Sequence, residues 1–289
     1  MSRTSKYALA FLLLALSTGQ ALAQKQKMPS LEKGEPPPGE AMKMTVGIAN
    51  AVLRDLLARR YLVVTKPGFL VPGQTWGETK SITIKTDMLL FDYDIATKDK
   101  HYTQHAKLVF SDIGNYFSTN SKGEYYYADY PHLNKIYRDL SGSLDVLAWA
   151  KQKDAQRFAD ALNRLLYESH VNKNPPLDNS AFNALAATWR KDPSVRPKPP
   201  EEWERHRLMA EEHFKENDHI AALESYEAAI AAWPPWAEGW FNAALLYSEL
   251  GEFTCAADRM KHYLELMPDA PDAKAARAKV LIWEEKAKE

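Results

Sequence analysis

The chain of 289 residues has a single cysteine, Cys255, so no disulfide can form within the monomer. Cys255 follows a helical pattern beside Ala256, which predicts a small packing residue; a reactive or intermolecular thiol is the alternative. The 12 glycines are scattered at turns, and neither a glycine-rich phosphate loop nor a nucleophile elbow occurs. These absences favour a protein that is not an enzyme and needs no cofactor.

An excess of charge is also missing. The sequence has 37 Lys and Arg residues against 38 Asp and Glu residues, which does not indicate a nucleic-acid-binding surface. His101 and His105 are four residues apart, as metal ligands on a helix would be, but their surroundings predict a loop that enters a strand. No Glu or Cys completes a zinc-binding set, so we expect no metal site.

The apolar run from Tyr7 to Leu16 is too short to span a bilayer comfortably. Arg3 and Lys6 precede it and Ala21-Leu22-Ala23 follows, which is the layout of a secretory signal cleaved after Ala23. No Cys follows the run, so a lipid-modified amino terminus is not indicated. We therefore expect residues 1–23 to be a signal peptide and the mature protein to be periplasmic or secreted, without an integral membrane segment.

Residues 24–41 are polar and contain Pro36-Pro37-Pro38, which predicts a disordered tether. Residues 42–170 are expected to form an α+β domain. It begins with a helix around Val46 to Leu57, where apolar residues recur every three or four positions, and a strand at Tyr61 to Thr65. Alternating or β-branched runs then predict a meander of short antiparallel strands at Ser81 to Lys85, Met88 to Tyr93, Lys107 to Phe110, Tyr116 to Ser118, Tyr125 to Tyr127 and Asn134 to Asp139.

A long amphipathic helix follows this meander. Its apolar side carries Phe158 and Leu162, whereas Asp160 and Asn163 lie on the predicted polar side. The order of elements over residues 79–167 resembles the pleckstrin-homology-like fold, which implies a barrel-like antiparallel sheet closed by one helix. Another α+β sheet with a packed helix remains open as the alternative.

Residues 171–200 are a Pro-rich linker that contains a short helix around 180–190, which could dock on either neighbour. From residue 201 to residue 289 the chain has a helical repeat. Pro234 and Pro268 are 34 residues apart, and the windows 203–236 and 237–270 that contain them share one helix-turn-helix pattern.

The second window has Trp240, Ala244, Tyr247, Gly251 and Ala256 at characteristic positions, and the first has Ala210, Asn217 and Ala222 at the matching ones. This pattern resembles the tetratricopeptide repeat family. We expect Asn217 to adopt the left-handed turn conformation that Gly251 adopts one repeat later. A last helix over residues 272–287, with Asp272 as its N-cap, is predicted to cap the array.

The resemblance implies that the concave face of the repeats binds a peptide. Carried over position by position, the concave face contains Glu204, Arg207, Glu211, Phe214, Glu238, Phe241, Leu245 and Ser248, and Lys274 and Arg277 of the last helix could extend it. The candidate binding groove is Arg207, Glu211, Phe241, Asn242, Leu245, Ser248, Lys274 and Arg277. Some members of the family hold a peptide carboxylate, and Arg207, Asn242 and Lys274 suit that role, but Glu211 stands where a second Asn would be expected. Such a mixed groove favours a peptide with apolar anchors and some acidic character.

The whole chain is similar to secreted bacterial proteins that carry a carboxyl-terminal tetratricopeptide module. We therefore expect an exported scaffold that binds a protein or peptide partner and no nucleic acid. The alternative is a ligand-binding or enzymatic α+β domain for which the repeats serve as a docking arm.

Overall fold

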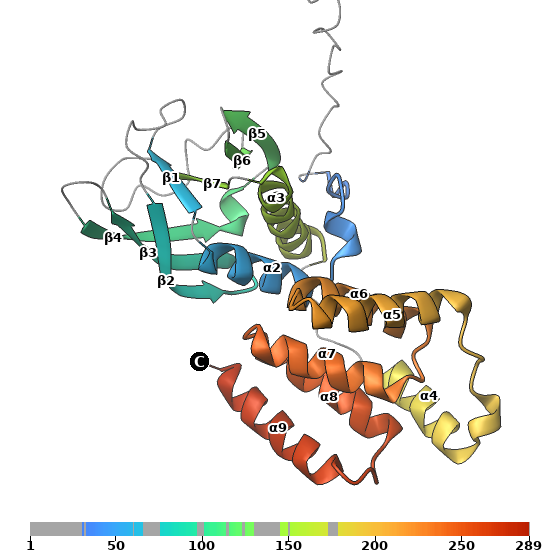
Figure 1. The fold of residues 1–289 in the computed structure, drawn as a ribbon. Helices are drawn as coiled ribbons and strands as arrows, with labels where there is room; N and C mark the ends of the chain where they lie inside the picture. The colour runs from blue at the N-terminus through green and yellow to red at the C-terminus, as the bar shows by residue number, and fades with distance from the viewer. Residues whose placement is uncertain are drawn as a thin grey trace, which may run out of the picture.

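The computed structural model describes residues 31, 33–59, 61–65, 76–96, 101–113, 116–122, 125–129, 145–149, 151–172 and 179–288. The expected signal peptide, residues 24–30 and 32 of the expected tether, and the strand predicted at Asn134 to Asp139 lie outside these ranges. The described chain is α+β. Figure 1 shows its sheet on one side and an array of helices on the other.

In the described ranges, seven strands form one antiparallel sheet in the order β4-β3-β2-β1-β7-β6-β5. The strands are β1 (Tyr61–Thr65), β2 (Trp76–Ile84), β3 (Met88–Ala96), β4 (His101–Val109), β5 (Ser118–Lys122), β6 (Tyr125–Asp129) and β7 (Asp145–Trp149). Strands β1 to β4 form one meander and strands β5 to β7 another, and the two meanders join where β1 pairs with β7. His101 and His105 lie within β4, so the loop predicted around them is wrong.

The sheet is not closed into a barrel, which corrects the expected barrel-like form. In the described chain β4 and β5 are its two edges. The segment after β4 begins with the turn η2 (Phe110–Asp112) and buries Phe110, Ile113 and Tyr116 in the core. Asn163 holds this segment through two hydrogen bonds with the backbone of Phe117, at 2.6 and 2.9 Å. The segment between the two edge strands is therefore used to build the core.

Helix α2 (Val46–Ala58) begins at Thr45, whose hydroxyl accepts a hydrogen bond from the Ile48 amide. Helix α3 (Gln152–Tyr167), which continues as the π-helical turn η4 (Glu168–Asn172), packs against α2 and against strands β5 to β7. Asp160 and Asn163 of α3 are buried, so their predicted polar, solvated side is wrong. The segment before α2, including the turn η1 (Ala41–Lys43), packs on α3 and lies against Asp160, whereas the segment after β4 lies against Asn163.

The carboxyl-terminal part contains α4 (Ser180–Lys191), the turn η5 (Pro193–Val195), α5 (Glu201–Lys215), α6 (His219–Ala232), α7 (Ala237–Glu249), α8 (Phe253–Leu266) and α9 (Ala273–Lys286). Helices α5 and α6 pack as one hairpin and α7 and α8 as the next, while α9 packs on α8. Asn217 and Gly251 have φ angles of 58° and 79°, which confirms the predicted left-handed turns. The short helix α4 docks on α8, where Phe182 contacts His262 at a ring distance of 4.3 Å.

Helix α2 lies between the sheet and the array and packs on both (Figure 1). The Thr45 hydroxyl lies 3.1 Å from the Tyr247 hydroxyl, and Arg54 forms an ion pair with the buried Glu252 at 2.5 Å. A Cβ atom on Gly47 would lie 2.6 Å from the Cys255 sulfur and 2.8 Å from the Tyr247 ring, so glycine allows this close approach. One continuous apolar core results, with members from both parts of the chain.

Candidate binding pocket in the helical array

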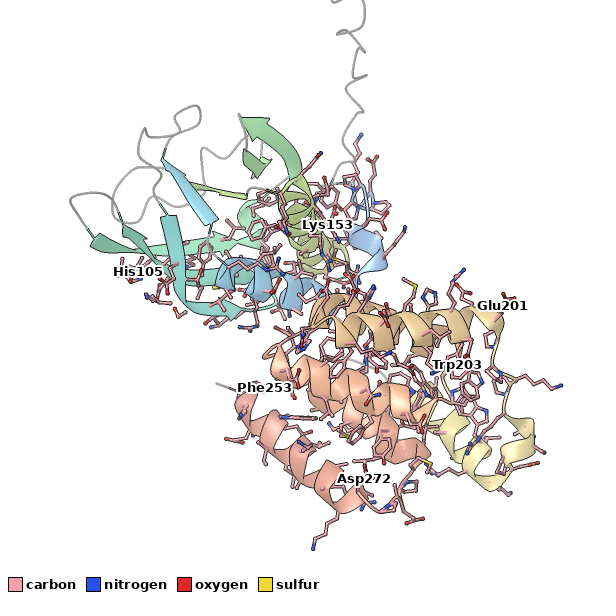
Figure 2. All side chains as sticks on the ribbon, in the orientation of Figure 1. His105, Lys153, Glu201, Trp203, Phe253 and Asp272 are labelled. Atoms are coloured by element: carbon pink, nitrogen blue, oxygen red, sulfur yellow. The ribbon has the colours of Figure 1, made fainter. Side chains whose placement is uncertain are left out.

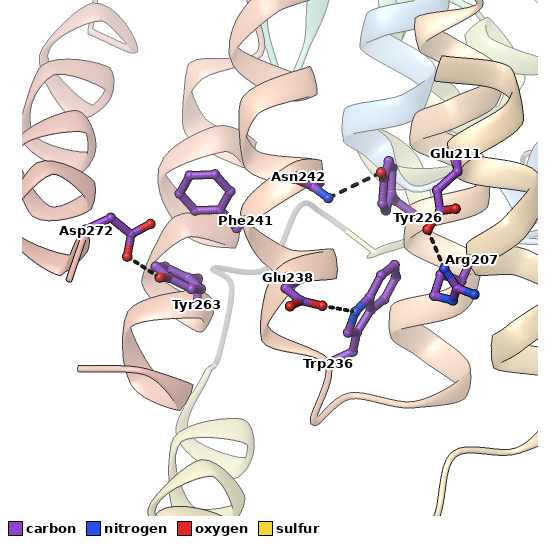
Figure 3. Close-up of a pocket in the computed structure, with 9 residues that line it drawn as sticks. All are labelled: Arg207, Glu211, Tyr226, Trp236, Glu238, Phe241, Asn242, Tyr263 and Asp272. Atoms are coloured by element: carbon purple, nitrogen blue, oxygen red, sulfur yellow. Dashed lines mark hydrogen bonds and ion pairs between the residues drawn. The ribbon is translucent and has the colours of Figure 1, made fainter. Parts of the chain in front are cut away.

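A pocket of about 300 Å³ opens on the helical array (Figure 3). Its walls come from α5, α6, α7, α8 and the residues just before α7 and α9. The lining residues are Arg207, Glu211, Tyr226, Trp236, Glu238, Phe241, Asn242, Tyr263 and Asp272. The pocket therefore combines four aromatic rings, three carboxylates, one amide and one guanidinium group.

The guanidinium group of Arg207 already has partners. It donates a hydrogen bond of 2.7 Å to Glu204 and another to Glu211, one turn away on either side along α5. It also lies over the ring of Trp203, 5.7 Å from the ring centroid. The hydrogen bond to Glu204 is the main cause that raises the pKa of Arg207. An arginine held this way is compensated within its own helix.

Two pairs of aromatic rings form the pocket walls. Tyr226 and Trp236 are stacked with ring centroids 5.7 Å apart, and Phe241 meets Tyr263 edge to face at 5.1 Å. Trp236 reaches its place because Gly239 has no side chain. A Cβ atom there would lie only 2.2 Å from the indole ring. The glycine in the first turn of α7 thus determines where one aromatic wall stands.

The remaining polar groups bond to these aromatic residues. The Trp236 indole N–H donates to Glu238 at 3.2 Å, the Tyr263 hydroxyl donates to Asp272, and Asn242 donates to the Tyr226 hydroxyl at 3.3 Å. Burial, followed by the bond to Asp272, raises the pKa of Tyr263 to about 12. Glu238 and Asp272 therefore accept hydrogen bonds from neutral donors, which carry no charge to balance a carboxylate.

The structure brings together half of the residues predicted for the groove. Arg207, Glu211, Phe241 and Asn242 line the pocket. The other four do not line it. Leu245 packs against the core, Ser248 donates its hydroxyl to the Leu245 carbonyl, Lys274 is exposed, and Arg277 donates to the Pro268 carbonyl. The carboxylate-binding set that would combine Arg207, Asn242 and Lys274 is therefore not assembled in this pocket.

Glu238 also lines the pocket, at a concave-face position carried over from the repeat family. Sequence reasoning missed Tyr226, Trp236, Tyr263 and Asp272 as lining residues. Asp272 occupies the N-cap position of α9, as predicted, but its side chain makes no capping hydrogen bond and accepts from Tyr263 instead. Gly239 was a signal that could have been used. Glycine is unfavourable in a helix, so glycine early in a predicted helix indicates that another group approaches the backbone closely there. That group is Trp236.

The sheet carries a polar cluster on β2, β3 and β4, where Asp92 accepts a hydrogen bond from the Ser81 hydroxyl at 2.8 Å and lies 2.7 Å from Nδ1 of His105. A serine nucleophile needs the imidazole as its direct proton acceptor, but here the carboxylate stands between the two. His105 lies on the sheet, far from Trp203 and Asp272 on the array (Figure 2). The described residues hold no group of three His, Cys, Asp or Glu side chains that could bind a metal ion.

Cys255 is a half-buried free cysteine on α8. Burial raises the pKa of its thiol to about 12, so the thiolate needed for nucleophilic or redox chemistry is scarce at neutral pH. This environment favours the packing role over a reactive thiol.

None of the helices in the described ranges is long and apolar enough to cross a membrane. No protein-family model and no curated protein matches the chain. Its function must therefore be inferred from the geometry of the pocket and of the elements that carry it.

Proposed function

We propose that this chain is an exported, non-catalytic scaffold whose residues 201–289 form a tetratricopeptide module that binds a segment of a partner protein. Equivalent residues of the two hairpins support the module. Ala210 and Ala244, one period apart, both have no exposed surface, and the same is true of Ala222 and Ala256. Small residues at these positions let the paired helices approach closely.

The amino-terminal part has a supporting role in this proposal. Two antiparallel meanders followed by α3 keep the order of elements that resembles a pleckstrin-homology-like domain. Through α2 this domain holds the two hairpins of the array at its side. The proposal assigns no catalytic function to the domain.

The observation that carries the proposal is the open pocket between the hairpins. Aromatic side chains are enriched at protein interfaces because they bury a large area at a small cost in conformational entropy. Phe241 is only partly buried although the core of the array is closely packed around it. A phenylalanine that stays partly exposed on the pocket, beside the Glu238 and Asp272 carboxylates, suits recognition of a partner better than it suits folding.

Site-specific photo-crosslinking tests the proposal. A photoreactive phenylalanine analogue at Glu238, on the pocket, should crosslink a defined partner in cells that express the protein. The same analogue at Leu281, which is 68% exposed on α9 and does not line the pocket, should not. Fractionation of the same cells checks the compartment, because the crosslinked product should be in the exported fraction.

Two phenylalanine substitutions provide the control. Phe241→Ala should remove the crosslink at residue 238, whereas Phe214→Ala should leave it, because Phe214 is 49% exposed and lies outside the pocket lining. Equal crosslinking from positions 238 and 281, or an undiminished crosslink in Phe241→Ala, would argue against the pocket as the binding surface.

A further inference from the structure

We infer that the pocket binds a positively charged side chain, lysine or arginine, presented by the partner protein. This inference rests on the proposed function and specifies its partner chemistry. It reverses the charge that the sequence indicated, since the candidate arginines favoured a partner with acidic character. The reasons are the charge balance of the pocket, the arrangement of its rings and its size.

The charges that line the pocket are predominantly negative. The lining residues include three carboxylates, those of Glu211, Glu238 and Asp272, and one guanidinium group, that of Arg207, which leaves two negative charges. Arg207 is shared with Glu204, a further carboxylate beside the pocket. Glu238 and Asp272 have no ion-pair partner in the described part of the chain, and their hydrogen bonds come from an indole and a phenol. A bound cation would balance the negative charge of these two carboxylates.

The rings point to the same chemistry. In Figure 3, Glu238 lies between the pair Phe241 and Tyr263 and the pair Tyr226 and Trp236. The faces of such rings carry partial negative charge and attract ammonium and guanidinium groups. Carboxylates beside the partly exposed ring of Phe241 are therefore suited to a basic head group, and this ring can also receive the aliphatic stem that lysine and arginine share.

The size of the pocket limits what can enter. Its volume of about 300 Å³ is at the lower end of the range for small-molecule sites, roughly 300–1,000 Å³. One long side chain fits such a space, with the peptide backbone crossing the opening. A carboxylate ligand would have to compete with Glu204 and Glu211 for Arg207 and would lie beside two further carboxylates.

Titration of the full mature chain with capped amino acids tests the inference. The probes are N-acetyl-lysine methylamide and N-acetyl-arginine methylamide, with N-acetyl-glutamate methylamide as the opposite charge. The readout is the indole N–H resonance of Trp236, assigned through Trp236→Phe, because this N–H bonds to Glu238. We expect saturable shifts with the two basic probes, reduced by added salt, and none with the glutamate probe.

Charge variants sharpen the test. Glu238→Gln and Asp272→Asn should each weaken lysine binding by about 2- to 5-fold, as expected for a partly exposed ion pair. Glu212→Gln, an exposed acid outside the pocket, is the matched control and should change nothing. Arg207→Gln should strengthen lysine binding, whereas capture of a carboxylate would require this variant to lose binding of the glutamate probe. Well-dispersed amide spectra show that each variant is folded.

Three outcomes would overturn the inference: a response to glutamate without a response to lysine, no response to any probe, or loss of lysine binding in Arg207→Gln. These three outcomes can be distinguished from failure of the proposed function. If the partner still crosslinks at position 238 while the basic probes fail to bind, the pocket contacts a partner through other chemistry. If crosslinking fails as well, the proposed binding surface itself is wrong.

Discussion

At the scale of single residues, the polar side chains of α3 show how position in the fold changes chemistry. Asn163 and Asp160 are both buried. Asn163 uses its amide to bind both backbone groups of Phe117, so its polar atoms have partners. Asp160 accepts a hydrogen bond from Gln156 at 3.0 Å, but burial outweighs this bond and raises its pKa from 3.8 to about 6.

This shift predicts a pH effect with a definite sign. The unfolded carboxyl ionises near pH 4 and the folded one near pH 6, so stability that is present below pH 4 is lost as pH rises through 6. Two pKa units correspond to about 3 kcal/mol. Because asparagine does not ionise, Asp160→Asn should raise the free energy of unfolding by about 2 kcal/mol at pH 7 and leave it nearly unchanged at pH 4.

Urea unfolding at both pH values measures this difference. Asp192→Asn is the control, because Asp192 is exposed and its hydrogen bond from the Ser194 side chain lowers its pKa. The control should not gain stability at pH 7. An equal effect of Asp160→Asn at pH 4 and pH 7 would show that ionisation of Asp160 is not its cause.

At the scale of elements, the helices of the array show that a repeated pattern does not produce the same burial in every unit. Ala244 and Tyr247 of α7 are completely buried, because α8 packs on α7 and the start of α2 also contacts Tyr247. One period later, Ala278 and Leu281 of α9 are exposed, and no helix of the described chain covers that face. Helix α9 instead buries Val280 and Trp283 toward α8.

Adjacent positions on α9 should therefore respond very differently to alanine. Val280 is 7% exposed, and Val280→Ala should lower the free energy of unfolding by about 1–3 kcal/mol because it leaves a cavity beside α8. Leu281→Ala should change it by less than about 0.5 kcal/mol, since its side chain is already in water. Chemical denaturation measures both. A larger loss for Leu281→Ala would mean that another chain covers this face in solution.

At the scale of the whole molecule, α2 joins the sheet to the array. Its Arg54 bonds both to Glu252 of the array and to the Ile82 carbonyl of β2, at 3.3 Å. Asn50 donates to the same carboxylate at 3.0 Å, and Arg157 of α3 adds a bond of 2.6 Å to Glu224 of α6. Together with the close contact at Gly47, these bonds hold the array against the sheet domain.

Removing Arg54 should weaken both parts together. Arg54→Ala would leave the buried Glu252 carboxylate without its cation and should lower the free energy of unfolding by about 2–3 kcal/mol. This loss is smaller than the one expected for a fully buried ion pair, because Arg54 is 26% exposed. Hydrogen exchange should accelerate in β2 and in α7 and α8. The double variant Arg54→Met with Glu252→Leu should recover most of the loss. Faster exchange confined to the array would show that α2 does not couple the two parts.

The elements with strong periodicity were the most predictable from the sequence. The apolar spacing around Val46 to Leu57 predicted α2, and the recurring pattern predicted left-handed turns at Asn217 and Gly251. The open edges of the sheet were not predictable, since pairing between distant strands depends on where the connecting segments pack. In the pocket, the first-helix positions were found, but Tyr226 and Tyr263 come from second helices and Trp236 from a turn.

The sequence by itself determined the α+β composition, the period of the helical hairpins and the absence of any charge excess, because these depend on local spacing and on residue counts. The tertiary structure decided the chemistry of the pocket. Arg207 was a candidate anion ligand in the sequence, yet its neighbours Glu204 and Glu211 compensate it, while Glu238 and Asp272 line a pocket with four rings and have no ion-pair partner among the described residues. The ion pairs of Arg207 follow from local spacing along α5. Glu211, Glu238 and Asp272, however, come from three separate segments of the chain, and they share one pocket only after the helices have packed.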